Sequence, residues 1–143
     1  MIKYKDMIIF TLVIDLCLIY IYNTSKLNNF DKINVLTLFF VHLVFYISLL
    51  NKYNLLLDIS HMFFIAQVNI VSLFTTNIKI LMLYIFIILV MLYYWFRDNK
   101  CPLGQFERFK QINNFLIRNE KLTYVSPFLI LPILLYKIYK KSN

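Results

Sequence analysis

The sequence predicts an all-α protein that crosses a membrane several times as one bundle of helices. Two runs, residues 33–51 and 80–96, contain no Lys, Arg, Asp or Glu, in a chain of 143 residues that is 61% hydrophobic. A helix needs roughly 20 such residues to cross a hydrocarbon core about 30 Å thick. A chain of this length has room for four or five spans, so we expect a single membrane domain over residues 1–143.

Five apolar segments follow one another, separated by polar turns rich in Asn and Lys. We expect helices, because strands that do not close into a barrel leave backbone groups unsatisfied in lipid. The first segment follows Lys3 and Lys5 and is followed by a polar loop without a small-residue cleavage site, so we expect it to be retained as a span. The expected helices cover residues 5–22, 33–51, 53–78, 80–96 and 122–140.

The fifth segment differs from the other four. Pro127 and Pro132 interrupt it, and Lys137 has to extend its ammonium group toward the membrane surface if the segment spans. We expect a kinked helix that either crosses the membrane or only enters it. Basic residues divide nine against six if it crosses and twelve against three if it does not, and both counts place the N-terminus and the 97–121 loop in the cytosol.

The net charge of +8 indicates contact with lipid headgroups. In a soluble protein such a charge would suggest nucleic acid. Here the basic residues flank the apolar segments, so we expect anionic headgroups to be their partners and no nucleic acid to bind. The expected partners are therefore the lipid bilayer and either other membrane proteins or a second copy of this chain.

The loop after the fourth segment predicts an interfacial amphipathic helix over residues 102–119. Its apolar residues recur at steps of three and four, and they are Phe106, Phe109, Ile112, Phe115 and Leu116. Pro102 fits the first position of this helix, which makes Cys101 its N-cap. A thiolate would be favoured there by the helix dipole and by Arg97 and Lys100, although a cysteine that only packs the turn is the interpretation we prefer.

A short motif around this loop resembles a known group of proteins. Trp95, followed by Cys101-Pro102-Leu103 and Glu107, is similar to the Trp…Cys-x-Leu-x-x-x-Glu signature of small uncharacterised membrane proteins from bacteria and large DNA viruses. The resemblance covers about residues 55–109, with Asp58 and His61 on an earlier span, and departs at Gly104, where the relatives more often have Thr. It implies a multi-span helical fold in which Trp95, Cys101, Pro102 and Glu107 form a structural elbow, and it implies no activity.

The third segment carries a stripe of polar residues. At 100° per residue, one narrow face of that helix collects Asp58, His61, Asn69, Ser72 and Thr76. Ser60 and Gln67 fall on the opposite side. We expect the stripe to face the interior of the bundle. The fourth segment has only Tyr84 with a polar tip between residues 80 and 91, so we expect that helix to form a wall facing lipid.

Polar residues on different apolar segments are expected to lie at similar depths in the membrane. His42 and His61 lie nine or ten residues on either side of the turn at Asn51 and Lys52. On antiparallel helices both would sit about 14 Å from that turn, at 1.5 Å per residue. Asp15 is in the middle of its own segment. The sequence therefore predicts an intramembrane cluster of Asp15, His42, Asp58 and His61, with Asn69 and Ser72 beside it.

Three interpretations of this cluster remain open. In the preferred one the side chains hydrogen-bond the helices together, and the protein is a scaffold or interaction component of its membrane. In the second, Asp15, His42, Asp58 and His61 line the path of a small transporter or proton conductor. The third is a bis-histidine haem or metal site. We predict no cofactor, no bound metal and no catalytic residues. Ser60 and His61 cannot form a nucleophile–base pair, because neighbouring side chains on a helix point about 100° apart.

Overall fold

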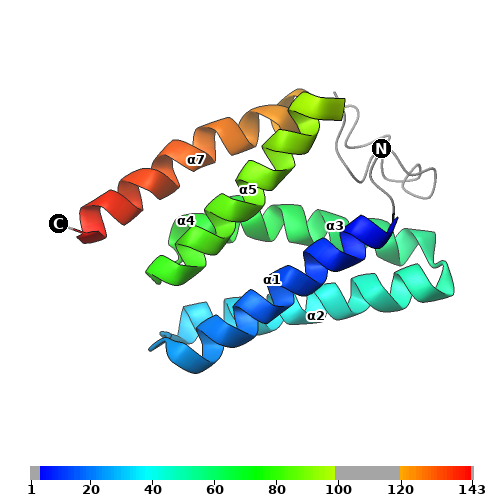
Figure 1. The fold of residues 1–143 in the computed structure, drawn as a ribbon, viewed down its shortest axis with the longest axis horizontal. Helices are drawn as coiled ribbons and strands as arrows, with labels where there is room; N and C mark the ends of the chain where they lie inside the picture. Colours follow the sequence, from blue (N-terminus) through cyan, green and yellow to red (C-terminus); the bar gives the residue numbers. More distant parts are fainter. Residues whose placement is uncertain (1–3, 99–119, 143) are drawn as a thin grey trace.

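The computed structural model of the chain describes residues 4–98 and 120–142, and these are helical apart from short connections (Figure 1). This confirms the all-α prediction for the described ranges, in which no strand occurs. The elements are α1 (Tyr4–Thr24), α2 (Asn29–Asn51), α3 (Asn54–Ala66), the π-helix η1 (Gln67–Val71), α4 (Ser72–Phe74), α5 (Ile78–Asp98) and α7 (Glu120–Ser142).

Within residues 4–98 and 120–142, four helices are long and apolar enough to cross a membrane. They are Lys5–Thr24, Asn29–Asn51, Asn54–Phe74 and Ile78–Arg97, each between 20 and 23 residues long. α7 is not among them; it continues through Pro127 and Pro132 as a helix of 23 residues and ends with lysines in its last turn. The expected interfacial helix over 102–119, with Cys101, Pro102 and Glu107, lies outside the described residues.

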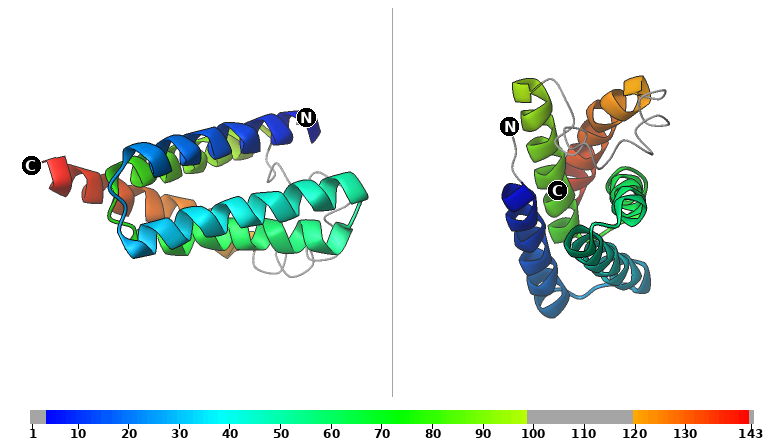
Figure 2. Two further views of the ribbon diagram at one scale, coloured as in Figure 1. Left: turned by 90° about the horizontal axis from the view of Figure 1, so that it is seen from below. Right: turned by 90° about the vertical axis from the view of Figure 1, so that its right-hand side faces the viewer.

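Successive long helices run in opposite directions along the bundle (Figures 1 and 2). The start of α1, the turn between α2 and α3, the end of α5 and the start of α7 lie at one end. The connection between α1 and α2, the one between α4 and α5, and the C-terminal end of α7 lie at the other. This alternation is what a chain that crosses a membrane repeatedly requires.

α2 begins four residues before the predicted start, because a cap lies upstream of its apolar run. The Asn28 side chain accepts a hydrogen bond from the Asp31 backbone N–H at 2.7 Å, which satisfies one of the free donors of the first turn. At the other end Lys52 adopts a left-handed conformation with φ of 60°, and its N–H bonds the Ser48 carbonyl. The chain thereby reverses within two residues and enters α3.

The third span contains a π-turn that the sequence pattern did not indicate. α3 passes into η1 at Gln67, and the α-helix resumes at Ser72 and ends at Phe74, four residues before the predicted end. A π-turn holds more residues than an α-turn, so it rotates everything after it relative to the 100° rule. The predicted polar stripe is therefore broken in this part of the helix.

The predicted facing of the third span was only partly right. Asp58, His61 and Ser72 are buried as expected, whereas Asn69 is half-buried and Thr76 is exposed. Ser60 and Gln67, expected on the opposite side, are also buried, at 3% and 6% exposure. Gln67 bonds Asn34 of α2, and Ser60 lines a cavity wall shared with α1 and α2, so this helix is buried on more than one side.

The prediction that the fourth apolar segment is a wall facing lipid was wrong. Within α5, Leu81, Tyr84, Ile87 and Ile88 are at most 1% exposed and belong to the main apolar core. Only one face of α5 points outward, and it carries Met82, Phe86, Leu89 and Tyr93. An uncharged helix suits the centre of a membrane bundle as well as its edge, so composition alone could not distinguish the two positions.

Candidate functional site

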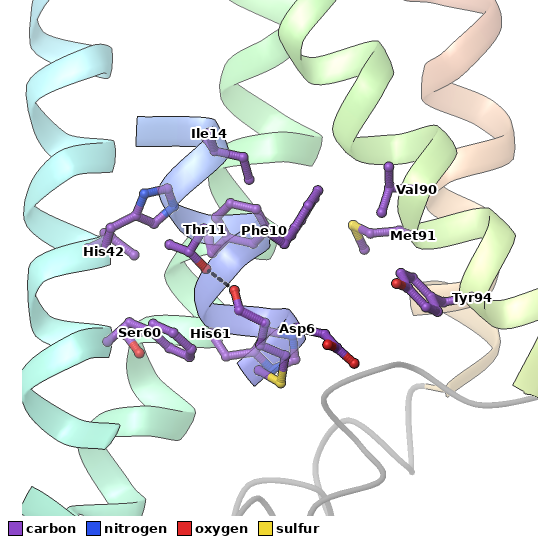
Figure 3. Close-up of a pocket in the computed structure, with 14 residues that line it drawn as sticks. Asp6, Phe10, Thr11, Ile14, His42, Ser60, His61, Val90, Met91 and Tyr94 are labelled. Atoms are coloured by element: carbon purple, nitrogen blue, oxygen red, sulfur yellow. Dashed lines mark hydrogen bonds between the residues drawn. The ribbon is translucent and has the colours of Figure 1, made fainter. Parts of the chain in front are cut away.

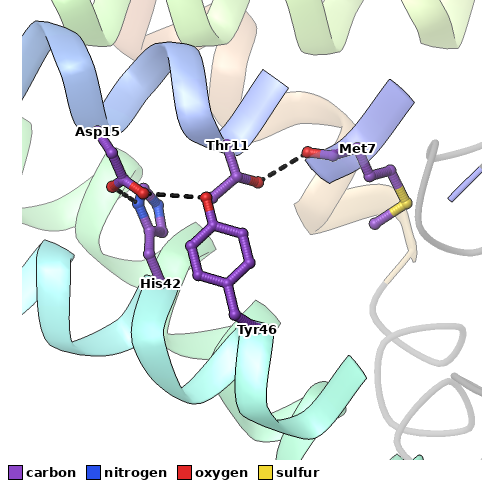
Figure 4. A network of polar contacts seen from close by, with 5 residues as sticks. All are labelled: Met7, Thr11, Asp15, His42 and Tyr46. Atoms are coloured by element: carbon purple, nitrogen blue, oxygen red, sulfur yellow. Dashed lines mark hydrogen bonds and ion pairs between the residues drawn. The ribbon is translucent and has the colours of Figure 1, made fainter. Parts of the chain in front are cut away.

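The clearest polar contact between helices joins α1 to α2 (Figure 4). His42 Nδ1 lies 2.5 Å from Asp15 Oδ1, and the Tyr46 hydroxyl donates to Asp15 Oδ2 at 3.0 Å. His42 and Tyr46 are four residues apart, so they lie on the same face of α2 and reach one carboxylate together. Each carboxylate oxygen of Asp15 therefore has a partner on α2. The sequence analysis placed Asp15 and His42 in one cluster with Asp58 and His61, and the structure brings the side chains of Asp15 and His42 into contact.

A cavity of about 100 Å³ lies beside this contact, between α1, α2, α3 and α5 (Figure 3). Most of its wall is apolar, with phenylalanines, methionines and branched side chains. The polar side chains on the wall are Asp6, Thr11, His42, Ser60 and His61, with the hydroxyl of Tyr94.

His42 and His61 therefore lie at one level, as the count from the turn predicted, and they share the cavity wall. Asp15 and Asp58 are not among the side chains that line it. Asp58 is buried on α3 at 2% exposure. The structure brings together Asp15 with His42 and His42 with His61, and it leaves Asp58 outside the described cavity wall.

A second polar group, which the sequence analysis did not connect, joins three helical elements in the core. Gln67 Nε2 donates to the Asn34 backbone carbonyl at 2.9 Å and to Asn34 Oδ1 at 2.7 Å. The Tyr84 hydroxyl donates to the same Oδ1 at 3.0 Å. The group ties α2 to η1 and α5. The signal was present in the sequence, because Tyr84 is the one polar tip in its run and a buried hydroxyl needs a partner.

A third polar group holds the start of α2 against the end of the third span. The Thr75 hydroxyl donates to Asp31 Oδ1, and the Thr76 hydroxyl lies 3.4 Å from Asp31 Oδ2. Asn28 Nδ2 also donates to the Thr76 hydroxyl oxygen at 3.0 Å. Asp31 is 1% exposed, so its carboxylate depends on these donors.

Lys137 of α7 contacts the end of the third apolar segment. Its ammonium group lies 2.7 Å from the Leu73 and Thr75 carbonyl oxygens and 3.4 Å from that of Ser72. Lys141, one turn later, bonds the Thr76 carbonyl. These carbonyls lie at and just beyond the end of a helix, where the intrahelical donors run out, so a cation is favoured there.

Asn69 and Ser72, predicted beside the cluster, bond their own helix. Asn69 Nδ2 donates to the Ile65 carbonyl at 2.8 Å, and the Ser72 hydroxyl lies 3.4 Å from the Asn69 carbonyl. Trp95 of the predicted elbow is buried in the main core near the end of α5. Among the residues that the structure describes, no three His, Cys, Asp or Glu side chains are placed to hold a metal ion.

These features define a class: an α-helical bundle in which four described helices are long and apolar enough to cross a membrane, with polar contacts between the helices and a small cavity among them. A search of protein-family models, curated proteins and solved structures finds no match to the chain. The resemblance based on Trp95, Cys101 and Glu107 stays a prediction.

Proposed function

We propose that the protein is a multi-pass integral membrane protein that serves as a scaffold or interaction component of its membrane. The observation that supports this most is the use of the polar side chains within and beside the four candidate spans. Three groups, centred on Asp15, Asn34 and Asp31, each connect separate helices. Lys137 connects α7 to the end of α4 through the Leu73 carbonyl.

Such contacts suit a bundle that has few small side chains. Close packing of helices in membranes ordinarily relies on Gly, Ala and Ser at the interfaces, and this chain has one Gly. Hydrogen bonds between helices contribute about 0.6 kcal/mol each on average and up to about 1.7. Three such groups would add a few kcal/mol, which is a substantial part of the about 5–15 kcal/mol by which folded proteins are ordinarily stable.

The outer surface supports lipid, a second copy or another membrane protein as partners. Large apolar side chains cover it on every candidate span, and examples are Leu16, Phe40, Phe63 and Leu89, between 50% and 66% exposed. We propose that α7 is a fifth crossing, because it lies along α5 and reaches the opposite end of the bundle (Figure 1). The N-terminus and the 97–121 loop would then be cytosolic, on the side with more basic residues.

A second candidate function is a small transporter or proton conductor. The observation that favours it is the Asp15–His42 pair, which adjoins a cavity also lined by His61. Ionisable residues at membrane depth commonly mark proton relays. A bis-histidine haem site would use His42 and His61, and a haem absorption band in the purified protein would identify it.

Proton flux separates the two main proposals. The full chain is reconstituted into liposomes that contain a pH-sensitive dye, and a potassium gradient with valinomycin drives protons. The scaffold proposal predicts acidification no faster than in protein-free liposomes. Flux above that level which is lost in Asp15→Asn, with unchanged thermal unfolding, would replace it with the conductor proposal.

A further inference from the structure

Lysines gather at the end of the bundle that holds the α1–α2 connection, the α4–α5 connection and the C-terminal end of α7 (Figures 1 and 2). The one acidic side chain at this end, among the described residues, is Asp31, which is 1% exposed and accepts from the Thr75 hydroxyl. Lys137 and Lys141 bond backbone carbonyls, which carry no net charge. The described part of the protein therefore leaves the positive charge at this end without a matching negative charge. The lysines are Lys26, Lys32, Lys79, Lys137, Lys140 and Lys141.

Lys79, in the first turn of α5, is held in place by two side chains of α1, neither of which is charged. Its ammonium group donates to the Thr24 hydroxyl oxygen at 3.0 Å and lies 5.0 Å from the centre of the Tyr20 ring. The Thr24 hydroxyl gives its own proton to the Tyr20 carbonyl at 2.7 Å, so its oxygen is the acceptor for Lys79. An ammonium group has three donors, and this contact uses one of them. Lys79 makes no ion pair with the described residues, so a cation is positioned here with donors left for an anion.

The surface beside Lys79 becomes apolar along the contact between α1 and α5. On α1, Leu16 lies one turn before Tyr20, on the same face, and is 66% exposed. On α5, Met82 lies one turn after Lys79 and is 54% exposed, and Phe86 follows it at 44%. Because α1 and α5 run in opposite directions, these apolar side chains all lie farther from the end of the bundle than the ammonium group. The cation therefore lies at the end of an exposed apolar seam.

We propose that Lys79, Thr24 and Tyr20 form a binding site for the headgroup phosphate of an anionic phospholipid. The phosphate accepts a hydrogen bond from the Lys79 ammonium group, and an acyl chain lies along Leu16 and Met82. Exposed tyrosine and lysine side chains are typical of the level of the lipid headgroups. An anionic lipid fits better than a zwitterionic one, because this end has no exposed carboxylate among the described residues to pair with a choline group. The inference rests on the proposed membrane location and adds a defined lipid partner to it.

Native mass spectrometry of the full chain in a non-ionic detergent tests the site. Phosphatidylglycerol and phosphatidylcholine with the same oleoyl chains are titrated separately, and the affinity for the first bound lipid is measured. We expect phosphatidylglycerol to bind roughly fivefold more tightly, the contribution of one lysine near an anionic headgroup. Equal binding of the two lipids would overturn the site and leave the membrane location standing. A chain that retains neither lipid and stays monodisperse without detergent would contradict the membrane location itself.

Inorganic phosphate distinguishes a lipid from a free anion as the occupant. Because the seam at Leu16 and Met82 should hold the acyl chain, a large excess of inorganic phosphate should leave phosphatidylglycerol bound, as sodium chloride of the same ionic strength does. Displacement by phosphate but not by chloride would show a site for the free anion and would overturn the proposal.

Charge variants locate the headgroup. Lys79→Gln should weaken phosphatidylglycerol binding roughly fivefold and remove the preference over phosphatidylcholine, whereas Lys79→Arg should keep most of that preference. Lys140→Gln is the matched control, because it removes one charge from the same end of the bundle. Lys140 is exposed and makes no hydrogen bond or ion pair with the described residues. An equal loss of affinity in Lys79→Gln and Lys140→Gln would indicate a diffuse positive surface and would overturn the assignment.

Thr24→Val separates the position of the cation from its charge. Valine keeps the side-chain shape and the net charge, but it removes the acceptor that holds Lys79, so phosphatidylglycerol binding should weaken several-fold. Thr37→Val is the control, because Thr37 is exposed and its hydroxyl donates to the Ile33 carbonyl of its own helix at 2.8 Å. Unchanged phosphatidylglycerol binding in both Thr24→Val and Lys79→Gln would place the lipid elsewhere and refute the proposal.

Discussion

Replacement of Lys137 by Met should loosen α7 from the bundle. Methionine keeps much of the apolar stem and removes the ammonium group, which has three donors near three carbonyls. Two of those contacts are 2.7 Å long, and the third, at 3.4 Å, is weak. Hydrogen bonds to a charged group contribute about 1.5–3 kcal/mol each. Because Lys137 is half-buried and water can reach part of the site, we expect a loss of about 2–4 kcal/mol in the free energy of unfolding.

The measurement is reversible unfolding of the full chain in mixed micelles, with Lys140→Met as the control. Lys140 lies three residues later on α7 and is exposed, and it makes no hydrogen bond or ion pair with the described residues. Both variants remove one positive charge from the same end of the bundle, so their difference isolates the carbonyl contacts. A difference below about 0.5 kcal/mol would refute the reasoning, since surface charge changes are of that size.

Three further predictions concern the core, the buried carboxylate and the orientation. Tyr84→Phe removes one hydrogen bond to Asn34 and should lower the unfolding free energy by about 1 kcal/mol in the same assay, and an unchanged value would count against the contact. Asp58→Asn should change the thermal unfolding temperature little, whereas Asp58→Leu should lower it clearly, because leucine leaves the polar neighbours unsatisfied in hydrocarbon. Equal unfolding temperatures of the two variants would contradict this prediction. A cysteine placed at Asn113 should react with an impermeant maleimide only from the cytosolic side, and labelling from outside would reverse the proposed orientation.

The approximate positions of the apolar helices in residues 4–98 and 120–142 followed from the sequence, because they depend on composition and length. Runs without charge must be helical in lipid, and charged turns mark their ends. The predicted bounds differ from the structure by a few residues, and the difference at α2 has a local cause, the Asn28 cap. Capping residues lie in the polar turns, where hydropathy carries no information about the helix start.

The partners of the polar side chains were harder to predict. The depth of His42 and His61 followed from counting residues, and Asp15 was placed at the same level. The predicted direction of each side chain, at 100° per residue, fails after η1, because a π-turn leaves no signature in the spacing of apolar residues. Gln67, the first residue of η1, was expected away from the interior and instead meets Asn34, because α2 covers the side of the helix opposite the predicted stripe.

The position of α5 at the centre could not follow from its own sequence. In water, an apolar face shows which side of a helix is buried, but in lipid both the inner and the outer faces are apolar. Tyr84 was the single clue, since a hydroxyl deep in a span needs an acceptor from a neighbouring helix. The partners of Lys137 could not be predicted either, because nothing in its sequence context shows the helix end against which it packs.

The central claim is that the polar side chains at membrane depth bind helix to helix, and a double-mutant cycle on Asp15 and His42 tests it most directly. The unfolding free energies of the wild type, Asp15→Ala, His42→Ala and the double variant give the coupling between the two side chains. The contact of 2.5 Å in a largely buried setting predicts a coupling of at least about 1 kcal/mol. Additive effects, within about 0.5 kcal/mol, would contradict the claim.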